Sequence, residues 1–422
     1  MVRCCTITLA EPPGVGQKDG PSGEKGDGTA MGVAQPVNFE ALEVQARTLL
    51  AVFIAAGYEA VAPEIIQPAG VFLDVVGETL RGRTYVFTDL NGEELCLRPD
   101  LTVPTCRLYL QRHPEADREA FYSYNGPAFR FQPASADASH PREFRQAGIE
   151  AFGDKDAGEA DARTLVLMLR ALQQAGLPGW KLRIGDVGLF DALLGVAEMP
   201  DRWRRRLRHQ FWRPEAFRAE LKRLSTEPAR SMAGVPGDLI DALDPDDPGG
   251  AEALVAEHLD KAGIELIGVR SAAEIAEGLL AIAADAKAPP LKLEAAALID
   301  AYVRTRAPAA KTAGELRRLV GKASDGLAAA IDAYERRCAL LAESGIDMSA
   351  VDFSAEFGRS VGYYTGFVFE VLVEALGPSS PVAGGGRYDG LLKAVGAPRS
   401  VPAVGGAVHT ERLLTVVRGG RR

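Results

Sequence analysis

Two polar stretches, far apart in the chain, contain the residues whose types and spacing could do chemistry. The first covers residues 129–132 and resumes over 144–153, and the second covers 359–366 and resumes over 385–391. Together they supply carboxylates, arginines, amides and tyrosines. A free amino acid needs a carboxylate for its ammonium group, a cation or amide for its carboxylate, and a shaped socket for its side chain. The two stretches therefore look like the halves of one amino-acid-binding pocket.

Residue alternation predicts that strands position the first stretch. Residues 129–132 alternate phenylalanine with a polar residue, as in a half-buried strand. In the following strand Gln146, Gly148 and Glu150 share one face, while residues 147, 149 and 151 between them are apolar. This pattern predicts a polar binding surface backed by an apolar core.

Further helices and strands are expected on both sides of these stretches. An amphipathic helix is expected from Phe39 to Gly57, and Asn91-Gly92 predicts a tight two-residue turn between strands 84–88 and 94–98. Later patterns predict a helix over 156–174, a strand over 181–186, a helix over 189–194, a strand over 363–373, a glycine-rich turn over 384–386, and a strand over 401–407 that leads into a last helix through Arg412.

These elements predict an α+β fold, a mixed and mainly antiparallel sheet flanked by helices. Residues 1–30, rich in Gly, Pro and charged residues, are expected to form a disordered tail. The core is expected to occupy 31–197 and 351–422. Between its two parts, residues 198–350 are rich in Ala, Leu and charged residues and are expected to form a mostly helical insertion.

Composition restricts the class of protein and of partner. The 422 residues are 47% hydrophobic and 25% charged, as in globular proteins, and the net charge of −9 argues against broad nucleic-acid binding. The five cysteines form no CxxC pair and no apolar run could span a bilayer, so we expect a cytoplasmic protein without metal, cofactor or membrane contact. A solvated helix is favoured over contact with RNA or an acidic partner for the basic cluster Arg202, Arg204, Arg205, Arg206 and Arg208.

Over residues 36–196 and 350–416, the order and spacing of these segments resemble those of histidyl-tRNA synthetase, a class II aminoacyl-tRNA synthetase. The motif Leu97–Thr102 and the segment Gly405–Arg412 also contribute to this resemblance. The resemblance implies that Asp100 and Thr102 hold the amino group of a bound histidine, and that Arg130 holds its carboxylate. It further implies that Gln146 and Glu150 contribute a polar pair to the site. The imidazole would lie among Arg359, Tyr363 and Tyr364.

Each of these residues also has a structural interpretation when it is taken alone. The alternatives are a helix cap for Asp100, ordinary strand positions for Tyr363 and Tyr364, and solvent-facing sheet positions for Gln146 and Glu150. Arg387 and Asp389 could equally form an internal salt bridge or contact the ligand. The order of all the segments together favours the binding site.

Several positions depart from the synthetase pattern where ATP would be bound. Gln132 replaces the glutamate that reads adenine, His140 stands where an arginine would reach the phosphates, His409 replaces a glycine, and Gly362 replaces an acidic residue, whereas Arg412 is kept. Charge neutralisation at the phosphates dominates this chemistry, so the departures predict that adenylation is lost. The sequence also ends ten residues after Arg412, where a synthetase would continue into an anticodon-binding domain.

A synthetase core with these features resembles the regulatory subunit of the short-form ATP phosphoribosyltransferase. That resemblance implies a non-catalytic role in the first step of histidine biosynthesis, in which ATP and phosphoribosyl pyrophosphate are joined, with feedback regulation by histidine. The implied partner is the short catalytic subunit, in a hetero-oligomer that contains a homodimer of this chain and no tRNA.

Two other functions stay open at the level of sequence. One is an active histidyl-tRNA synthetase of truncated form, against which the acidic charge, the altered ATP positions and the missing domain argue. Histidine-dependent exchange of pyrophosphate into ATP would support it. The other is a free-standing histidine sensor, which a neighbouring gene for a catalytic phosphoribosyltransferase would argue against.

Overall fold

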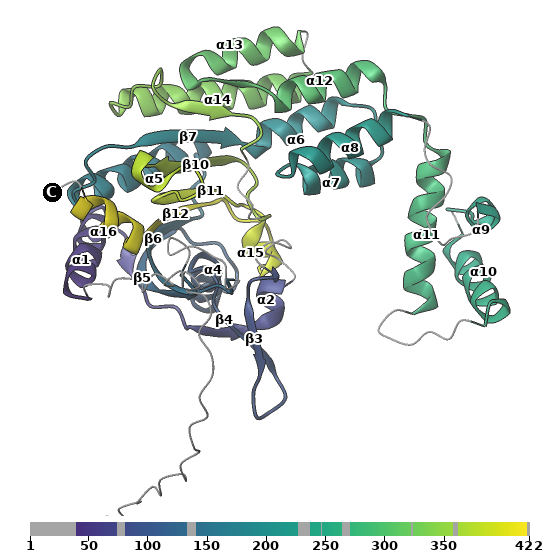
Figure 1. The fold of residues 1–422 in the computed structure, drawn as a ribbon, viewed down its shortest axis with the longest axis horizontal. Coiled ribbons are helices and arrows are strands. Elements are labelled where there is room, and N and C mark those ends of the chain that lie inside the picture. The colour runs from purple at the N-terminus through teal and green to yellow at the C-terminus, as the bar shows by residue number, and fades with distance from the viewer. Residues whose placement is uncertain are drawn as a thin grey trace, which may run out of the picture. The chain divides into compact units, whose positions relative to one another are not determined.

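The computed structural model describes residues 39–73, 81–132, 141–226, 237–245, 247–263, 271–321, 324–357 and 362–419 (Figure 1). The tail predicted over 1–30 and the candidate residue Arg359 lie outside these ranges. None of the helices described in them is both long and apolar enough to cross a membrane.

A mixed sheet of nine strands organises the molecule, in the order β1-β5-β6-β12-β11-β10-β7-β9-β8. Neighbouring strands are antiparallel except for the parallel pairs β1–β5 and β7–β9, so the predicted fold class is confirmed. The strands are β1 (Glu59–Ala60), β5 (Ala120–Phe129), β6 (Glu143–Phe152), β7 (Lys181–Asp186), β8 (Arg306–Pro308), β9 (Asp352–Ser354), β10 (Phe367–Leu372), β11 (Ala383–Arg387) and β12 (Ala403–His409). A second sheet, in the order β2-β4-β3, contains β2 (Ile66–Pro68), β3 (Tyr85–Thr88) and β4 (Glu94–Leu97).

The two faces of the large sheet are covered differently. Helices α1 (Phe39–Ala55), α5 (Ala157–Gln174) and α16 (Thr410–Gly419) pack on one face, where Ala147 and Ile149 of β6 are fully buried in the main core (Figure 1). A separate core involves the short helix α2 (Ala69–Leu73), α4 (Thr102–Arg112) and α15 (Leu391–Ala394). Because strand residues alternate, the polar side chains of β6 point away from the main core, as the sequence predicts.

Residues 198–350 are mostly helical where they are described, as predicted. Their apolar side chains belong largely to the main core, while α9–α11 enclose a small core of their own that includes Ile240 and Leu279. The helices are α6 (Val187–Val196), which precedes this segment, and α7 (Asp201–Gln210), α8 (Pro214–Ser225), α9 (Gly237–Ala242), α10 (Pro248–Lys261), α11 (Ala272–Lys287), α12 (Leu293–Val303), α13 (Ala309–Val320) and α14 (Asp325–Glu343). The short strand β8 within this segment was not predicted.

Two expectations about local structure are wrong. Residues 384–386 form the middle of strand β11 instead of a turn, because glycine lets β11 approach its neighbours closely. A Cβ on Gly385 would lie 2.6 Å from the Cα of Gly406. Strand β10 begins only at Phe367, so Tyr363 and Tyr364 precede the strand and lie outside it.

The hairpin β3–β4 is confirmed, but its loop is longer than two residues. Asp89 Oδ1 accepts hydrogen bonds from the backbone N–H groups of Asn91 (2.8 Å) and Glu93 (2.9 Å). This carboxylate organises the loop, in which Gly92 adopts a positive φ of 84°.

Candidate ligand site

Most of the candidate residues surround one cavity on the polar face of the large sheet. Its free volume is about 30 Å³, room for about two water molecules. Six candidates line it, together with residues of β11 and β12 and a third tyrosine: Asp100, Thr102, Arg130, Gln146, Tyr363, Tyr364, Gly384, Tyr388, Gly405, Gly406 and Ala407. The structure thus brings together groups that are more than 260 residues apart in the sequence.

The seventh described candidate, Glu150, lies beside this lining instead of in it. Its side chain is fully buried and accepts hydrogen bonds from the hydroxyls of Tyr124 (2.9 Å) and Tyr388. Opposite it on β12, a Cβ on Gly405 would overlap Glu150 Oε2. Burial raises the pKa of Glu150 to about 7, against the opposing effect of the hydrogen bonds from Tyr388, Thr102 and Tyr124.

Asp100 supplies a second buried carboxylate at the edge of the cavity. It is 5% exposed, and its Oδ1 accepts a hydrogen bond of 3.1 Å from the backbone N–H of Val103 in the first turn of α4. Asp100 therefore hydrogen-bonds the first turn of α4, in line with its structural interpretation, and it also lines the cavity, where its contact with a ligand stays a prediction. Burial raises the pKa of Asp100, while the positive charge of Arg130 opposes the rise.

The cationic and amide groups of the site are fixed by the backbone around them. Arg130 Nε donates to the carbonyl of Pro99 at 2.8 Å, and its guanidinium lies 5.0 Å from the ring centre of Phe144. Gln146 Oε1 accepts from the backbone N–H of Leu101 at 3.2 Å. Both side chains therefore meet the segment that carries Asp100.

Three tyrosines form the aromatic wall of the cavity. The ring centres of Tyr363 and Tyr364 are 4.8 Å apart, and Tyr388 packs edge-on against Tyr363 at 5.7 Å. All three residues are less than 10% exposed. The sequence had indicated Tyr363 and Tyr364; Tyr388 and Tyr124 were not selected, although Tyr388 lies within the second polar stretch.

Two residues that depart from the synthetase pattern, Gln132 and His409, and the kept Arg412 have packing partners outside the cavity. Gln132 Oε1 accepts a hydrogen bond from Arg83, and the ring of His409 packs at 5.4 Å against Phe144. Arg412 Nη1 donates to the carbonyl of Pro381 at 2.9 Å. None of these three lines the cavity, and His140 lies outside the described residues.

Arg387 and Asp389 form an internal ion pair, one of the two interpretations that the sequence left open. Arg387 Nη1 lies 2.9 Å from Asp389 Oδ1, and its Nη2 lies 2.7 Å from the fully buried Asp161. These groups stabilise the end of β11 behind the tyrosines.

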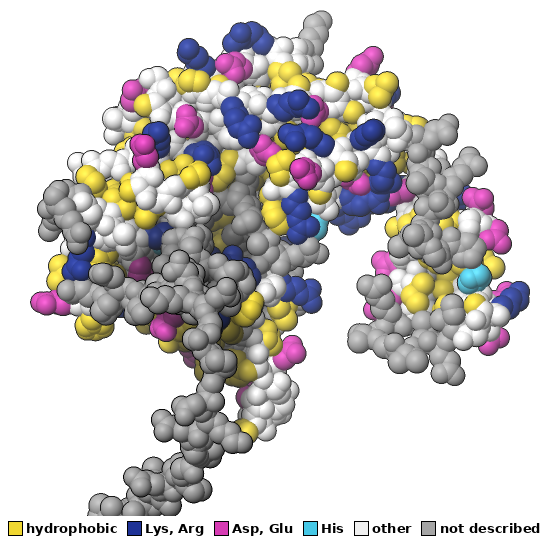
Figure 2. Space-filling view, viewed as in Figure 1, with side chains coloured by type: hydrophobic (Ala, Val, Ile, Leu, Met, Phe, Trp, Pro, Cys, Tyr) yellow, Lys and Arg dark blue, Asp and Glu magenta, His cyan; other side chains and the backbone are white. Residues whose placement is uncertain are grey.

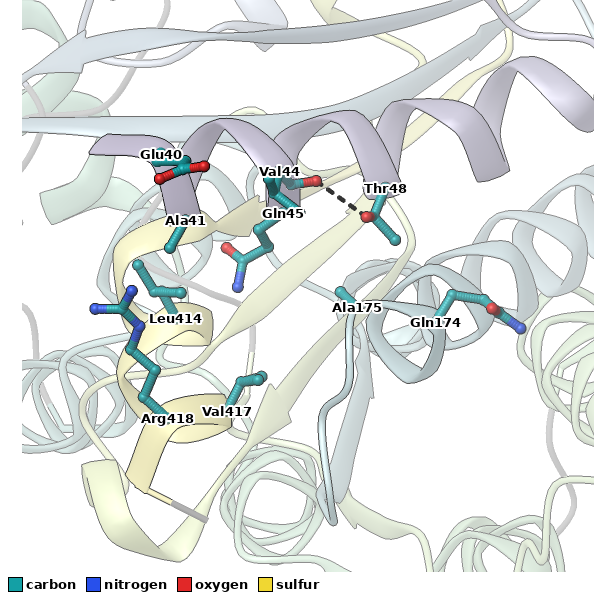
Figure 3. A pocket seen from close by; sticks show the side chains of 10 residues that line it. All are labelled: Glu40, Ala41, Val44, Gln45, Thr48, Gln174, Ala175, Leu414, Val417 and Arg418. Carbon is teal, nitrogen blue, oxygen red and sulfur yellow. Dashed lines mark hydrogen bonds between the residues drawn. The ribbon is translucent and has the colours of Figure 1, made fainter. Parts of the chain in front are cut away.

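A roomier groove lies on the helical face of the molecule, between α1, α5 and α16 (Figure 3). Its volume is about 410 Å³. It contains no buried acid or convergent set of charges: Thr48 donates to the carbonyl of Val44 at 3.0 Å within its own helix, and Glu40 and Arg418 lie at its rim (Figure 3). The small cavity is the better candidate because buried, convergent polar groups mark ligand sites more reliably than volume does.

Comparisons with known proteins identify the family and the fold of the chain. The family model for histidyl-tRNA synthetase matches residues 33–236 and 277–413. The chain is 34% identical over 370 residues to the ATP phosphoribosyltransferase regulatory subunit of Mesorhizobium japonicum, covering 87% of this chain and 96% of the relative. It is 37% identical over 377 residues to the protein of the same name from Agrobacterium fabrum, covering 87% and 95%.

Solved structures show the same fold at lower sequence identity. An ATP phosphoribosyltransferase regulatory subunit/histidyl-tRNA synthetase from Bacillus halodurans aligns with a TM-score of 0.64 and 22% identity over 91% of this chain and 81% of the other. The histidyl-tRNA synthetase of Nostoc aligns with a TM-score of 0.55 and 16% identity over 90% and 72%.

Proposed function

The chain belongs to the family of ATP phosphoribosyltransferase regulatory subunits, and from this premise we propose that it binds histidine in the cavity between Asp100 and the tyrosines and thereby regulates a catalytic partner. The partner is the short catalytic ATP phosphoribosyltransferase subunit, with which this chain forms a hetero-oligomer that contains a homodimer of the regulatory chain. The assembly is cytoplasmic, performs the first step of histidine biosynthesis, and binds no tRNA.

The observation that supports the ligand is the arrangement of charge and aromatic surface around the cavity. Asp100 offers a carboxylate to the ammonium group and Arg130 a cation to the carboxylate, while Tyr363, Tyr364 and Tyr388 enclose the space for a ring. Tyrosine hydroxyls and the neighbouring buried Glu150 give an imidazole the polar surroundings that an aliphatic side chain cannot use. Arg359 belongs to the proposed set on the resemblance alone.

We also propose that aminoacylation has been lost. The support is the altered ATP side: Gln132 pairs with Arg83, and His409 packs against Phe144, whose ring also meets the guanidinium of Arg130. Histidine-dependent exchange of pyrophosphate into ATP by the purified chain would contradict this proposal.

Reconstitution with the catalytic subunit tests the proposed function. The chain alone should show no phosphoribosyl transfer, and the mixture should show transfer that histidine inhibits. A coupling of about 1–3 kcal/mol corresponds to roughly 5–150-fold modulation. Activity of the catalytic subunit that does not change when this chain is added would reject the proposal.

A further inference from the structure

Hydrogen bonds to the backbone of residues 364–366 help to hold Tyr363 and Tyr364 of the tyrosine wall in place. The N–H of Thr365 donates to the carbonyl of Arg387 at 2.8 Å, and the carbonyl of Gly366 accepts from the N–H of Val187 at 2.9 Å. The carbonyl of Tyr364 accepts a hydrogen bond of 2.8 Å from Arg208 Nη2. The first two contacts join backbone to backbone within the sheet region, whereas the third comes from a side chain on helix α7.

Arg208 is placed to hold this wall against the core. Its guanidinium also forms an ion pair with Asp191 of α6, and the Arg208 side chain is 29% exposed. Partial burial lowers the pKa of Arg208. A charged group that gives up part of its hydration for a carboxylate and a single backbone carbonyl makes a directional contact, because charge-assisted hydrogen bonds are shorter and stronger than neutral ones.

The rest of helix α7 is fastened to a different part of the molecule. Three of its side chains converge on the buried carboxylate of Asp285, near the end of α11: Arg202, Trp203 through Nε1 at 2.6 Å, and Arg206 at 2.6 Å. Lys and Arg side chains gather over α7 and α8 with carboxylates among them (Figure 2). Arg202 and Arg206 therefore pair with a buried carboxylate, unlike the simple solvated face expected, although their side chains stay 26% and 40% exposed, and Arg205 is exposed as expected.

The small volume of the cavity leads to an expectation about the wall. Because only about 30 Å³ is open to water-sized groups, we expect the tyrosine wall to shift when an amino acid binds. The carbonyl of Tyr364 would shift with it, and Arg208 connects that carbonyl to α7. Helix α7 in turn holds Asp285 of α11.

We propose that Arg208 is a positioning residue of the ligand site, which holds the tyrosine wall in place and passes its displacement through α7 to Trp203 and α11. This inference rests on the proposed function, namely that histidine occupies the cavity. It adds a specific route by which histidine in the cavity changes the structure of the helical segment.

The fluorescence of Trp203 can report on this route. Of its three tryptophans, Trp203 alone lies on α7, so the double substitution W180F/W212F leaves a single tryptophan, which is hydrogen-bonded to Asp285. In that background, Arg208→Gln removes the contact, and Arg208→Lys keeps the charge opposite Asp191. Asp191→Asn removes the ion pair and keeps the bond to Tyr364. Arg205→Gln is the matched control, because Arg205 lies on the same helix and is exposed.

Histidine affinity by calorimetry and Trp203 emission are measured on each variant. We expect histidine to shift the emission of the background protein. Arg208→Gln should bind histidine roughly tenfold more weakly and lose the shift at saturation. Arg208→Lys should be intermediate, and Asp191→Asn and Arg205→Gln should keep both signals. If Arg208→Gln does not fold, Arg208→Lys supplies the comparison.

Two results would overturn the inference, and they differ from failure of the proposed function. Bound histidine with unchanged affinity and emission in Arg208→Gln would exclude the route while leaving the histidine site intact. If calorimetry shows no histidine binding to the wild-type chain, the proposed function fails. Hydrogen exchange then decides the positioning role, since amides of residues 362–367 should exchange faster in Arg208→Gln than in Arg205→Gln, and equal rates would refute it.

Discussion

Two clusters of buried ionisable side chains lie next to the large sheet, and they differ in the partners of their carboxylates. The first, the balanced cluster, consists of Asp161, Asp186, Arg337 and Arg387, all no more than 7% exposed. Arg337 binds Asp161 at 2.8 Å and Asp186 at 2.7 Å, and Arg387 binds Asp161 at 2.7 Å. Two carboxylates thus meet two guanidiniums.

The second, the acidic cluster, consists of Asp100, Glu150, Tyr124 and Tyr388 and lies at the ligand site. Here hydroxyls and backbone N–H groups supply hydrogen bonds to the two acids, while the positive charges of Arg130, which lines the cavity, and of the buried Arg98 act on Asp100. Burial raises the pKa of both acids. A closed network of ion pairs fastens elements together, whereas buried acids that hydroxyls and N–H groups hold favour an added ammonium or imidazolium group.

The largest expected effect is on the balanced cluster. Arg337→Met should lower the free energy of unfolding by about 3–5 kcal/mol, because two buried carboxylates lose a partner. Arg336→Met is the matched control: Arg336 is next in sequence and pairs with Asp156 at the surface, where solvent screens the pair, so its loss should cost far less. Denaturant unfolding measures both. If both variants lost the same free energy of unfolding, the buried ion pairs would contribute no more to stability than the exposed pair.

The acidic cluster should make stability depend on pH. The folded pKa of Glu150, about 7, exceeds its ordinary value of 4.5, so the folded state holds the proton more tightly and the free energy of unfolding falls as pH rises from about 4.5 to 7. The difference corresponds to about 3 kcal/mol.

Glu150→Gln should remove this contribution and be the more stable form at pH 8, as measured by unfolding at several pH values. Glu143→Gln, at an exposed position of the same strand, is the control and should keep the wild-type profile. If the stability of Glu150→Gln depended on pH as that of the wild type does, the pH dependence would not come from Glu150.

The glycines beneath the cavity should be intolerant of a methyl group. Gly405→Ala places its Cβ on the Glu150 carboxylate and should cost about 1–3 kcal/mol of stability. Gly314→Ala, inside helix α13 where a Cβ meets nothing within 4 Å, should instead stabilise by about 0.5–1 kcal/mol. Thermal unfolding compares the two, and a neutral Gly405→Ala would mean that the carboxylate is free to move.

The smallest effect is expected from a single hydroxyl of the lining. Thr102→Val should weaken histidine binding several-fold, by about 1 kcal/mol, because one polar group of the site is lost. Thr48→Val, on the exposed side of α1, should leave the affinity unchanged. Calorimetric titration provides the comparison; unchanged affinity in Thr102→Val would remove Thr102 from the proposed contacts.

More residues of the acidic cluster than of the balanced cluster could be predicted from the sequence. Period-two alternation around Gln146 and Glu150 shows which side chains share a face, and this property is local. The orders and spacings of the synthetase-like segments then indicated Asp100, Arg130 and the tyrosine pair. That Glu150 lies behind Tyr388 could not be predicted, because it depends on how β11 and β12 approach β6.

The balanced cluster and Arg208 were missed because their partners are remote in sequence. Arg337 lies on an otherwise apolar helix face, an unusual position that could have indicated a buried ion pair, but nothing local identifies Asp161 as its partner 176 residues away. Arg208 was grouped with its neighbours as a charge run. Glycines 384–386 were assigned to a turn because their need for close strand approach is visible only in the sheet.

The most direct test is a calorimetric titration of the purified chain with histidine, beside Asp100→Asn. A cavity with the buried carboxylate of Asp100 in its lining should bind one histidine per chain saturably, and the isosteric loss of that carboxylate should weaken binding at least tenfold. Wild-type protein that takes up no histidine at millimolar concentration, or Asp100→Asn with full affinity, would contradict the account.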